Sequence, residues 1–402
     1  MIRDSITGKK LSIFGGEKEF KESIIISRPT PPPFQDIEEP LKEVLGNKWL
    51  TNGGKFLKSY EEKLSGYIGS KCIATSNGTV ALLILAKALG LKGEVIVPSF
   101  TFPATATSFN FLNIKTKFVD IDKETYCIDP NEVKRAINED TSAIVPVNIY
   151  GNCCDIKKLE NIAENNDLKL IFDSAHAFGA KYNGEMVGNF GDAEMFSTHA
   201  TKILITGEGG IISSKNNELL DKIRIQQNFG YDDLKDKSQI QTVGINAKMS
   251  EFPAIIGLWS LDNFENHKNR RNEIAKIYLN RLSKIKGIGF QKTTPGCERV
   301  YQFFSILIDK DKFGVDRDQL AEVLMKENVL TRKYFYLPVH QQHPYKTVEH
   351  DKLKITDEIS SNILCLPILS DMTNDQAERI CALIKLIHEQ AEEINNYFRK
   401  TS

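Results

Sequence analysis

One lysine, Lys202, has surroundings that suit covalent chemistry. It lies just after a short strand expected at 194–197, in the stretch Phe196-Ser-Thr-His-Ala-Thr-Lys202-Ile-Leu-Ile-Thr-Gly-Glu-Gly-Gly210. A lysine held among neutral neighbours can lose its proton near neutral pH and attack a carbonyl carbon. The position therefore predicts a Schiff-base lysine rather than a lysine on a solvated surface.

A carboxylate upstream supplies the second group that such chemistry needs. The apolar run 168–172 predicts a buried strand, and Asp173 stands at its C-terminal end. In an open α/β sheet, ligands bind at that edge. Pyridoxal phosphate enzymes hold the cofactor through a lysine and need a carboxylate facing the pyridine nitrogen. Lys202 and Asp173 fit these roles, so the pair predicts pyridoxal 5'-phosphate as the cofactor.

Ser76-Asn-Gly-Thr79 predicts an anion site, because it follows a strand and opens an apolar helix. The free N–H groups and the positive dipole end of a first helical turn attract anions, and Thr79 adds a hydroxyl. The functional interpretation is a cradle for the cofactor phosphate, and the alternative is an ordinary capped helix. Ser197, five residues before Lys202, is either a second phosphate contact or a surface hydroxyl.

Two ring side chains are candidates for contact with the cofactor. Phe102 follows a strand, where its ring either stacks on an aromatic cofactor or belongs to the core. His176, three residues after Asp173, either touches the cofactor ring or its phenolic oxygen, or is a hydrogen-bonded structural histidine. His199 is open to either interpretation.

The remaining motifs argue against other classes of site. His340-Gln-Gln-His343 has a spacing seen in metal ligands, but no acidic or cysteine partner is near in sequence, so no metal is expected. The sequence has neither a Walker lysine loop nor a Gly-x-Gly-x-x-Gly dinucleotide loop. The seven cysteines, with Cys153 and Cys154 adjacent, favour reduced thiols in a cytoplasmic protein.

The composition is that of a globular protein large enough for two domains. The chain has 402 residues, 41% of them hydrophobic and 26% charged, and a net charge of −1. This balance gives no reason to expect nucleic acid or anionic membrane as a partner. No apolar run reaches the roughly 18 residues of a membrane span, and no signal peptide is expected at the N-terminus.

The elements that must position these residues alternate between strand and helix. Strands are expected at 71–75, 94–97, 117–121, 142–150 and 168–172, and helices at 80–89, 102–112, 130–138 and 156–165. Near-continuous apolar strands in such an order indicate a mostly parallel sheet with helices on both faces. An Asn183-Gly184 pair predicts a tight hairpin turn before the strand at 194–197, and a further strand is expected at 211–214.

The two ends of the chain differ from this pattern. An edge strand is possible at 24–26, and helices are expected at 35–46 and 56–68. Because Pro40 lies inside the first of these helices, a start only just before Pro40 is the alternative. Ser250 could cap one long helix reaching about residue 282. Beyond it we expect a smaller α+β part, with strands at 302–308 and 330–333 and helices at 317–326 and 374–398. The predicted domains are a leader (1–33), a large cofactor-binding domain (34–255) and a small C-terminal domain (256–402).

Several stretches together resemble a known family. They are Trp49-Leu-Thr-Asn-Gly, Ser76-Asn-Gly-Thr-Val-Ala-Leu, Val97-Pro-Ser-Phe-Thr-Phe, Phe118-Val-Asp-Ile-Asp, Asp173-Ser-Ala-His-Ala-Phe-Gly-Ala, Phe196-Ser through Lys202, Gly207-Glu-Gly-Gly and Gly244-Ile-Asn-Ala-Lys-Met-Ser-Glu251. In this order they resemble the DegT/DnrJ/EryC1/StrS sugar-nucleotide aminotransferases. The resemblance implies a fold-type-I pyridoxal phosphate enzyme, α/β in class, with a mostly parallel seven-stranded sheet and a smaller α+β C-terminal domain.

The resemblance also implies roles for single residues. Lys202 would carry the cofactor and Asp173 would pair with its pyridine nitrogen, both as catalytic residues. The remaining cofactor contacts would be Gly78, Thr79, Ser197, Phe102 and His176, with Asn246 reaching the phosphate of a neighbouring subunit, so that a homodimer shares its active sites. Tyr336 and His340 are the predicted substrate contacts.

The branch within the family is less sharply marked. His199-Ala-Thr-Lys202, Asn228-Phe-Gly-Tyr231 and Thr331-Arg-Lys-Tyr-Phe-Tyr336 are most similar to enzymes that aminate C4 of dTDP-4-keto-6-deoxy-D-glucose. The expected amino donor is L-glutamate, and the amino sugar would enter surface polysaccharide such as the lipopolysaccharide O-antigen. The stretch 338–345 is similar to members that act at C3. Many members have histidine where this chain has asparagine in Val147-Asn-Ile-Tyr-Gly151, which puts the contact of that histidine in question.

Two other functions are compatible with the same residues. One is a pyridoxal phosphate enzyme of another reaction type, such as a sugar dehydratase or a lyase. Some relatives that act as 3-dehydratases have histidine at the position of Lys202, so the lysine favours transamination. The other is a non-catalytic sugar-nucleotide-binding protein, against which the Lys202–Asp173 pair argues.

Overall fold

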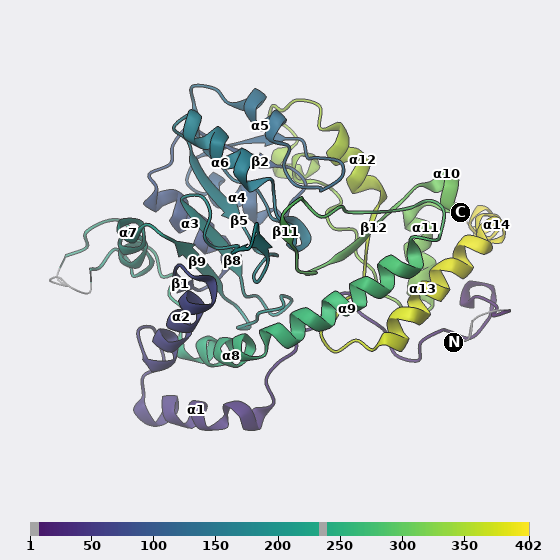
Figure 1. The fold of residues 1–402 in the computed structure, drawn as a ribbon, viewed down its shortest axis with the longest axis horizontal. Coiled ribbons are helices and arrows are strands. Elements are labelled where there is room, and N and C mark those ends of the chain that lie inside the picture. Colours follow the sequence, from purple (N-terminus) through teal and green to yellow (C-terminus); the bar gives the residue numbers. More distant parts are fainter. Residues whose placement is uncertain (1–7, 233–238, 402) are drawn as a thin grey trace.

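The computed structural model describes residues 8–232 and 239–401 (Figure 1). Its α-helices are α1 (Phe34–Asn47), α2 (Lys55–Ile68), α3 (Gly78–Ala88), α4 (Ala104–Asn110), α5 (Pro130–Ala136), α6 (Ile156–Asn165), α7 (Asn217–Gln227), α8 (Glu251–Asp262), α9 (Phe264–Leu282), α10 (Lys310–Phe313), α11 (Arg317–Lys326), α12 (Lys354–Asn362), α13 (Asn374–Glu389) and α14 (Ala391–Thr401). Its strands are β1 (Lys71–Thr75), β2 (Glu94–Pro98), β3 (Lys115–Val119), β4 (Thr141–Ile144), β5 (Lys169–Asp173), β6 (Lys181–Tyr182), β7 (Glu185–Met186), β8 (Ala193–Ser197), β9 (Gly210–Ser214), β10 (Ile288–Phe290), β11 (Cys297–Glu298), β12 (Phe304–Ile308) and β13 (Ile363–Leu366).

The main sheet has seven strands in the order β1-β9-β8-β5-β4-β2-β3. Strand β9 is antiparallel to both of its neighbours, and every other neighbouring pair is parallel. The expected mostly parallel seven-stranded sheet is therefore confirmed. The hairpin of β6 and β7 turns at Asn183 and Gly184, both with positive φ, as the Asn-Gly pair predicts.

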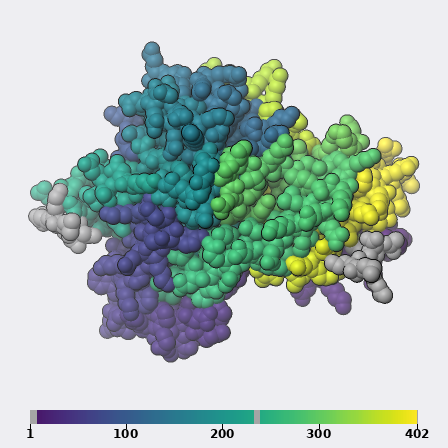
Figure 2. All heavy atoms as spheres, viewed as in Figure 1, coloured from purple at the N-terminus to yellow at the C-terminus, as the bar shows by residue number. Residues whose placement is uncertain are grey.

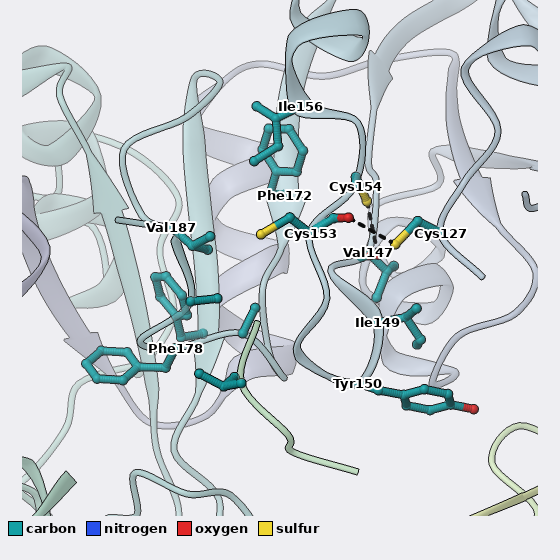
Figure 3. Packing of buried hydrophobic residues seen from close by; sticks show 14 of the residues in the cluster. Cys127, Val147, Ile149, Tyr150, Cys153, Cys154, Ile156, Phe172, Phe178 and Val187 are labelled. Atoms are coloured by element: carbon teal, nitrogen blue, oxygen red, sulfur yellow. Dashed lines mark hydrogen bonds between the residues drawn. The ribbon is translucent and has the colours of Figure 1, made fainter. Parts of the chain in front are cut away.

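Both faces of this sheet are covered, so its strands are apolar on both sides. In β5, Leu170 and Phe172 belong to one buried cluster and Ile171 belongs to another. Successive side chains of a strand point to opposite faces, which assigns the two clusters to the two faces. Figure 3 shows part of the first cluster, where Phe172 lies near Ile156 and the two adjacent cysteines. Because both faces of the strands are packed, the strand ends that carry the polar site residues are held in place.

A second sheet and its helices form the smaller α+β part of the fold. Strands β10, β12 and β13 pair antiparallel and share a separate buried cluster with helices α9, α11 and α13. Figure 2 shows most of the C-terminal third of the chain, in green and yellow, on one side of the molecule. This arrangement confirms the expected smaller α+β unit, while the predicted domain limits at residues 33 and 255 stay a prediction.

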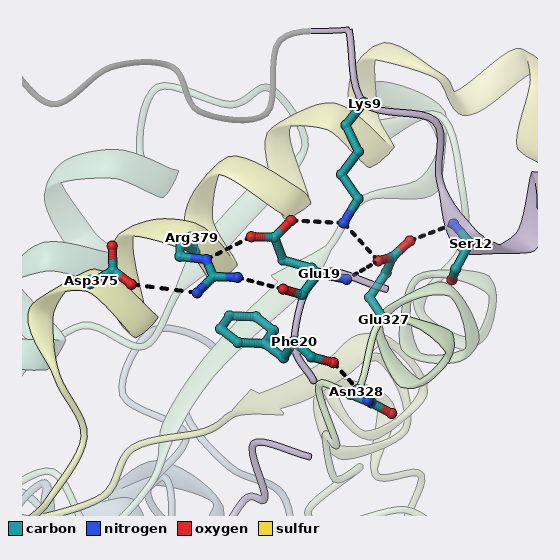
Figure 4. A network of polar contacts seen from close by, with 8 residues as sticks. All are labelled: Lys9, Ser12, Glu19, Phe20, Glu327, Asn328, Asp375 and Arg379. Atoms are coloured by element: carbon teal, nitrogen blue, oxygen red, sulfur yellow. Dashed lines mark hydrogen bonds and ion pairs between the residues drawn. The ribbon is translucent and has the colours of Figure 1, made fainter. Parts of the chain in front are cut away.

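The described part of the predicted leader packs on the C-terminal elements, while its residues 1–7 lie outside the described ranges. Leu11 and Phe20 belong to the buried cluster of α9, α11 and α13. The buried carboxylate of Glu327 accepts hydrogen bonds from the backbone N–H groups of Ser12 (2.6 Å) and residue 19 (2.7 Å). Lys9 pairs with the same carboxylate at 2.9 Å (Figure 4). The segment is thus part of the folded structure.

The long helix expected after Ser250 is interrupted. Helix α8 ends at Asp262 and α9 begins at Phe264, with Asn263 at φ −100° and ψ 0° between them. The side-chain amide of Asn263 donates to the carbonyl oxygen of Trp259 at 2.9 Å and so competes with the helical backbone for that acceptor. The predicted C-terminal helix is likewise divided, since Gln390 separates α13 from α14. Ser250 itself makes no side-chain cap bond.

Three expected strands, at 142–150, 24–26 and 330–333, were wrong in length or in existence. The strand expected at 142–150 ends at Ile144, because Pro146 lacks a backbone donor and the chain then turns at 149–151. Helix α1 runs from Phe34 to Asn47, so the expected helix at 35–46 is confirmed to within one residue at each end, and the alternative start just before Pro40 was wrong. The stretches 24–26 and 330–333 form no strand, because Leu330 bonds to Ile24 while Arg332 bonds to β13, so their pairing stays at isolated bridges.

Across the described residues, the helices are all too short or too polar to cross a membrane.

Candidate active site

A cavity of about 330 Å³ opens at the C-terminal edge of the parallel strands. Seven of the predicted site residues line it: Gly78, Thr79, Phe102, Asp173, His176, Ser197 and Lys202. They stand at the C-terminal ends of β5 and β8 or shortly after the ends of β1, β2, β5 and β8. The fold therefore brings together at one edge residues that are up to more than one hundred positions apart in the sequence. Phe303, Tyr334 and Phe335 close the cavity from the C-terminal part of the chain.

Asp173 is a buried carboxylate at the end of β5, with 5% of its surface exposed. Its Oδ2 accepts a hydrogen bond from the Thr105 hydroxyl at 2.7 Å, and Oδ1 accepts one from the N–H of Ala175 at 3.1 Å. Burial raises the pKa of Asp173, and these two bonds and the charge of Lys202 act in the opposite direction. The carboxylate is therefore oriented by neutral donors and is available to a cation in the cavity.

Lys202 lies in the cavity wall, where the surrounding atoms lower its pKa to about 8 and the charge of Asp173 partly offsets this. At that pKa a substantial fraction of the amine is neutral under mildly alkaline conditions. A neutral amine is the form that attacks a carbonyl carbon. The environment therefore suits the nucleophilic lysine expected from the sequence.

Gln302 holds the peptide groups on both sides of Lys202. Its side-chain oxygen accepts from the N–H of Ile203 at 3.2 Å, and its side-chain nitrogen donates to the carbonyl of Thr201 at 2.8 Å. Gln302 is 3% exposed, and the guanidinium of Arg271 donates a hydrogen bond to the backbone carbonyl oxygen of Gln302 at 3.2 Å. Gln302 is thus placed to fix the position of the lysine, a role that no local motif indicates.

His176 is held by the backbone rather than by another charge. Its Nδ1 accepts a hydrogen bond from the N–H of Tyr150 at 3.2 Å, and its ring stacks with Phe335 at a centroid distance of 6.2 Å. Burial and the charge of Lys202 lower the pKa of His176 well below its usual value. The neutral ring therefore presents its Nε2 side as a hydrogen-bond donor.

The N-terminus of α3 forms one end of the cavity. Asn77 caps this helix by accepting from the N–H of Val80 at 2.9 Å. Helix α3 begins at Gly78, and a Cβ added there would lie 3.0 Å from the sulfur of Met195 and 3.4 Å from Cβ of Ser197. Glycine therefore allows the first turn of α3 to approach β8 closely, which brings the hydroxyl of Ser197 to the same end of the cavity.

Phe102 supplies an exposed ring within a buried stretch. It is 58% exposed, whereas Phe100 and Thr101 are each 1% exposed. Its ring contacts that of Phe335 at 6.4 Å, edge to face, and otherwise borders the cavity. The core interpretation of Phe102 is therefore wrong, and the ring is free to stack on a planar ligand.

The three other predicted residues lie outside this cavity. Asn246 is exposed and accepts from the ammonium group of Lys248 at 2.8 Å. Tyr336 is 50% exposed, with the guanidinium of Arg317 over its ring at 4.7 Å. His340 is 5% exposed and hydrogen-bonds to the Ser99 hydroxyl at 2.6 Å. Their assigned roles toward cofactor and substrate stay predictions.

Comparison with known proteins identifies the family. Residues 34–385 match the profile of the DegT/DnrJ/EryC1/StrS aminotransferase family. The chain belongs to this family.

Relatives of this aminotransferase align over almost its whole length. It is 36% identical, over 371 residues, to the dTDP-4-amino-4,6-dideoxy-D-glucose transaminase of Shigella dysenteriae, covering 91% of this chain and all of the relative. It is 31% identical to the dTDP-3-amino-3,6-dideoxy-alpha-D-galactopyranose transaminase of Aneurinibacillus thermoaerophilus, over 86% of this chain and 93% of that one. A crystal structure of DesI with its TDP-sugar product superposes with a TM-score of 0.92, at 35% identity and over 97% and 99% of the two chains.

Enzymes of this family depend on pyridoxal phosphate, and the cavity fits that group on its own evidence. Within the part of the chain that the structure describes, the hydrogen-bond donors to the buried Asp173 carboxylate are both neutral, so it suits a protonated pyridine nitrogen. Phe102 offers a ring face, and the close approach of α3 to β8 at Gly78 leaves helical N–H groups for a phosphate. Among the described residues, no group of histidine, cysteine or acidic side chains could hold a metal ion.

Proposed function

We propose that this aminotransferase moves the amino group of L-glutamate to C4 of dTDP-4-keto-6-deoxy-D-glucose. The observation that carries the proposal is the placement of Lys202 and Asp173 in one cavity, with a helix N-terminus at its other end. The substrate is proposed from the Shigella relative, which is named for a dTDP-4-amino sugar, and from DesI, whose crystal structure contains its TDP-sugar product.

The residues of the chain have separate tasks in this reaction. When bound, pyridoxal phosphate supplies an electron sink that stabilises negative charge at the carbon losing its proton. Asp173 holds a proton on the pyridine nitrogen, and Phe102 and His176 orient the ring plane. The N–H groups at Gly78 and Thr79, with the Ser197 hydroxyl, bind the phosphate.

Lys202 has two tasks in succession. Lys202 would hold the cofactor through Nζ, and this nitrogen would be free to act as a base once the amino donor is bound. The freed Nζ accepts the proton from Cα of glutamate and later delivers a proton to C4 of the sugar. In the cofactor-free protein, burial already lowers the pKa of Lys202 to about 8, so a proton can leave and return to this amine near neutral pH.

The assembly and the biological setting are also proposals. A homodimer with shared active sites is supported by the exposed position of Asn246, outside its own cavity, where it could reach a phosphate bound by a neighbouring subunit. Tyr336 and His340 are proposed to touch the sugar nucleotide. We place the enzyme in the cytoplasm, where it would supply an amino sugar for surface polysaccharide such as O-antigen, and we propose domains at 34–255 and 256–402 after a leader.

The test is a reaction with L-glutamate and dTDP-4-keto-6-deoxy-D-glucose, followed by NMR of the product. Nitrogen at C4 supports the proposal. The Aneurinibacillus relative supports a second candidate, amination at C3 of a dTDP-3-keto-6-deoxyhexose. Conversion of that sugar alone would move the chemistry to C3, and dehydration without release of 2-oxoglutarate would refute transamination.

A further inference from the structure

Three cysteines, Cys127, Cys153 and Cys154, belong to the buried cluster that contains Phe172 of β5, and Cys297 packs against this cluster. Two of these four cysteines face each other. The sulfur atoms of Cys153 and Cys297 are 2.8 Å apart, although 144 positions separate them in the chain. Figure 3 shows that the sulfur of Cys153 points away from those of Cys127 and Cys154. The Cys154 sulfur instead donates to the carbonyl of Val147 at 3.1 Å. Cys153 therefore has Cys297 as its sulfur partner.

The backbone around the pair holds this geometry. The N–H of Cys153 donates to the sulfur of Cys297 at 3.2 Å, and the hydroxyl of Thr294 donates to the carbonyl of Cys153 at 2.5 Å. Cys297 begins β11, which pairs with Tyr182 of β6. Bonding distance between sulfurs is about 2.05 Å, so the gap to close is only about 0.8 Å.

The two thiols differ in access and in acidity. Cys153 is fully buried, whereas Cys297 is partly exposed between the exposed residues Gly296 and Glu298. The contact with the Cys153 thiol lowers the pKa of Cys297 most, the N–H of Cys153 and the charge of Arg299 lower it further, and burial acts against them. The contact with Cys297 and burial raise the pKa of Cys153. The accessible sulfur is thus also the more nucleophilic one.

We propose that Cys153 and Cys297 form a reversible disulfide by exchange with small-molecule disulfides. The Cys297 thiolate attacks one sulfur of the oxidant, which forms a mixed disulfide and releases one small thiol. Cys153 then gives up its proton and attacks the Cys297 sulfur, which forms the Cys153–Cys297 bond and releases the second small thiol. The protein loses two electrons and two protons, and one small disulfide becomes two thiols.

The bond would join two segments that support the active site. Val300 and Gln302, downstream of Cys297, donate backbone bonds to Gly151 and Tyr150, upstream of Cys153, at 3.1 and 3.2 Å. Gln302 is the residue that holds the peptides beside Lys202. Oxidation therefore links these two hydrogen-bonded segments covalently. The link should raise the melting temperature by roughly 5 °C. The inference does not depend on which sugar the enzyme aminates.

The test equilibrates the full-length protein with reduced and oxidised glutathione at a series of ratios. Free thiols are then alkylated, and the protein is analysed by intact mass and non-reducing peptide mapping. Wild-type protein and the control C127S should each lose two free thiols, and one cross-linked peptide pair should contain Cys153 and Cys297. C297S should keep its remaining thiols, and C153S should accumulate one glutathione on Cys297 because no second thiol displaces it.

Either of two results would overturn the proposal. One is wild-type protein in which Cys153 and Cys297 are both alkylated after equilibration in oxidised glutathione alone. The other is a C297S variant that still loses two thiols, since this would assign the reactive pair elsewhere. C153S provides an independent readout if C297S does not fold, because glutathione on any other cysteine would also contradict the assignment.

Discussion

Replacing Asp173 with asparagine tests the electrostatic core of the site. The substitution keeps the shape of the side chain and removes its charge. Its Oδ1 can still accept from the N–H of Ala175, and its new amide can donate to Thr105, whose hydroxyl can turn to Thr101, 2.8 Å away. The fold should therefore be retained. Because burial raises the pKa of Asp173, the ionised carboxylate weakens the cofactor-free fold at neutral pH, so the melting temperature should stay equal or rise.

The loss should instead appear in the reaction. Removing one partner of a buried ion pair costs about 3–5 kcal/mol. Since about 1.4 kcal/mol corresponds to a tenfold change in rate, kcat should fall roughly 10²- to 10⁴-fold. The assay is a single-turnover reaction of the loaded enzyme with glutamate, in which 2-oxoglutarate release and the visible absorbance of the cofactor are measured together.

A matched control separates charge from orientation. Thr105→Val removes the hydroxyl that positions Asp173 but keeps the carboxylate, so its rate should fall only about tenfold, as expected for one hydrogen bond to a charged group. The reasoning would be refuted by an Asp173→Asn enzyme that binds cofactor and reacts within about threefold of wild type. It would also be refuted if Thr105→Val were the slower variant.

Three further predictions concern the lysine and the phosphate end. Burial lowers the pKa of Lys202 to about 8. The rate at which apoenzyme takes up pyridoxal phosphate, measured by stopped-flow absorbance, should therefore rise about tenfold from pH 6 to 7 and level off above about pH 8. A rate that does not change with pH would contradict this. Gln302→Leu leaves the N–H of Ile203 unpaired and leaves the carbonyl of Thr201 with the longer bond from the Ser27 hydroxyl, at 3.3 Å. Denaturant titration should therefore show a loss of about 1–3 kcal/mol, and kcat should fall about tenfold. Gln302→Glu should retain part of the stability and part of the rate, and equal effects of the two variants would count against a positioning role. Gly78→Val forces α3 away from Met195, so equilibrium titration should show at least tenfold weaker cofactor binding. Unchanged affinity would show that cofactor binding does not depend on the close approach of α3 to β8.

The sequence predicts best where local pattern and tertiary environment agree. Strand β1 and helices α6 and α11 have the expected limits, because their apolar periodicity and flanking cap or turn residues coincide. The site residues that follow strands were also found, since the C-terminal ends of parallel strands meet at one edge. The break at Asn263 was missed because it depends on the direction of one amide side chain.

Other features depend on contacts between distant segments, which no local pattern indicates. Thr105 and Gln302 act on residues 68 and about 100 positions away, and their types are common in helices and strands alike. A strand was expected at 330–333, but the backbone bonds of this stretch are divided between Ile24 and β13. The sulfur contact of Cys153 with Cys297 arises in the same way, from the pairing of β11 with β6.

The assignment of Lys202 as the residue that carries the cofactor is tested most directly by reduction. The loaded enzyme is treated with sodium borohydride, which fixes a cofactor imine to its lysine, and the digested protein is mapped by mass spectrometry. We expect the pyridoxyl group on the peptide that contains Lys202, and no such group in Lys202→Ala. A pyridoxyl group on another lysine of the wild-type enzyme, or cofactor that reduction never attaches to the chain, would contradict the account.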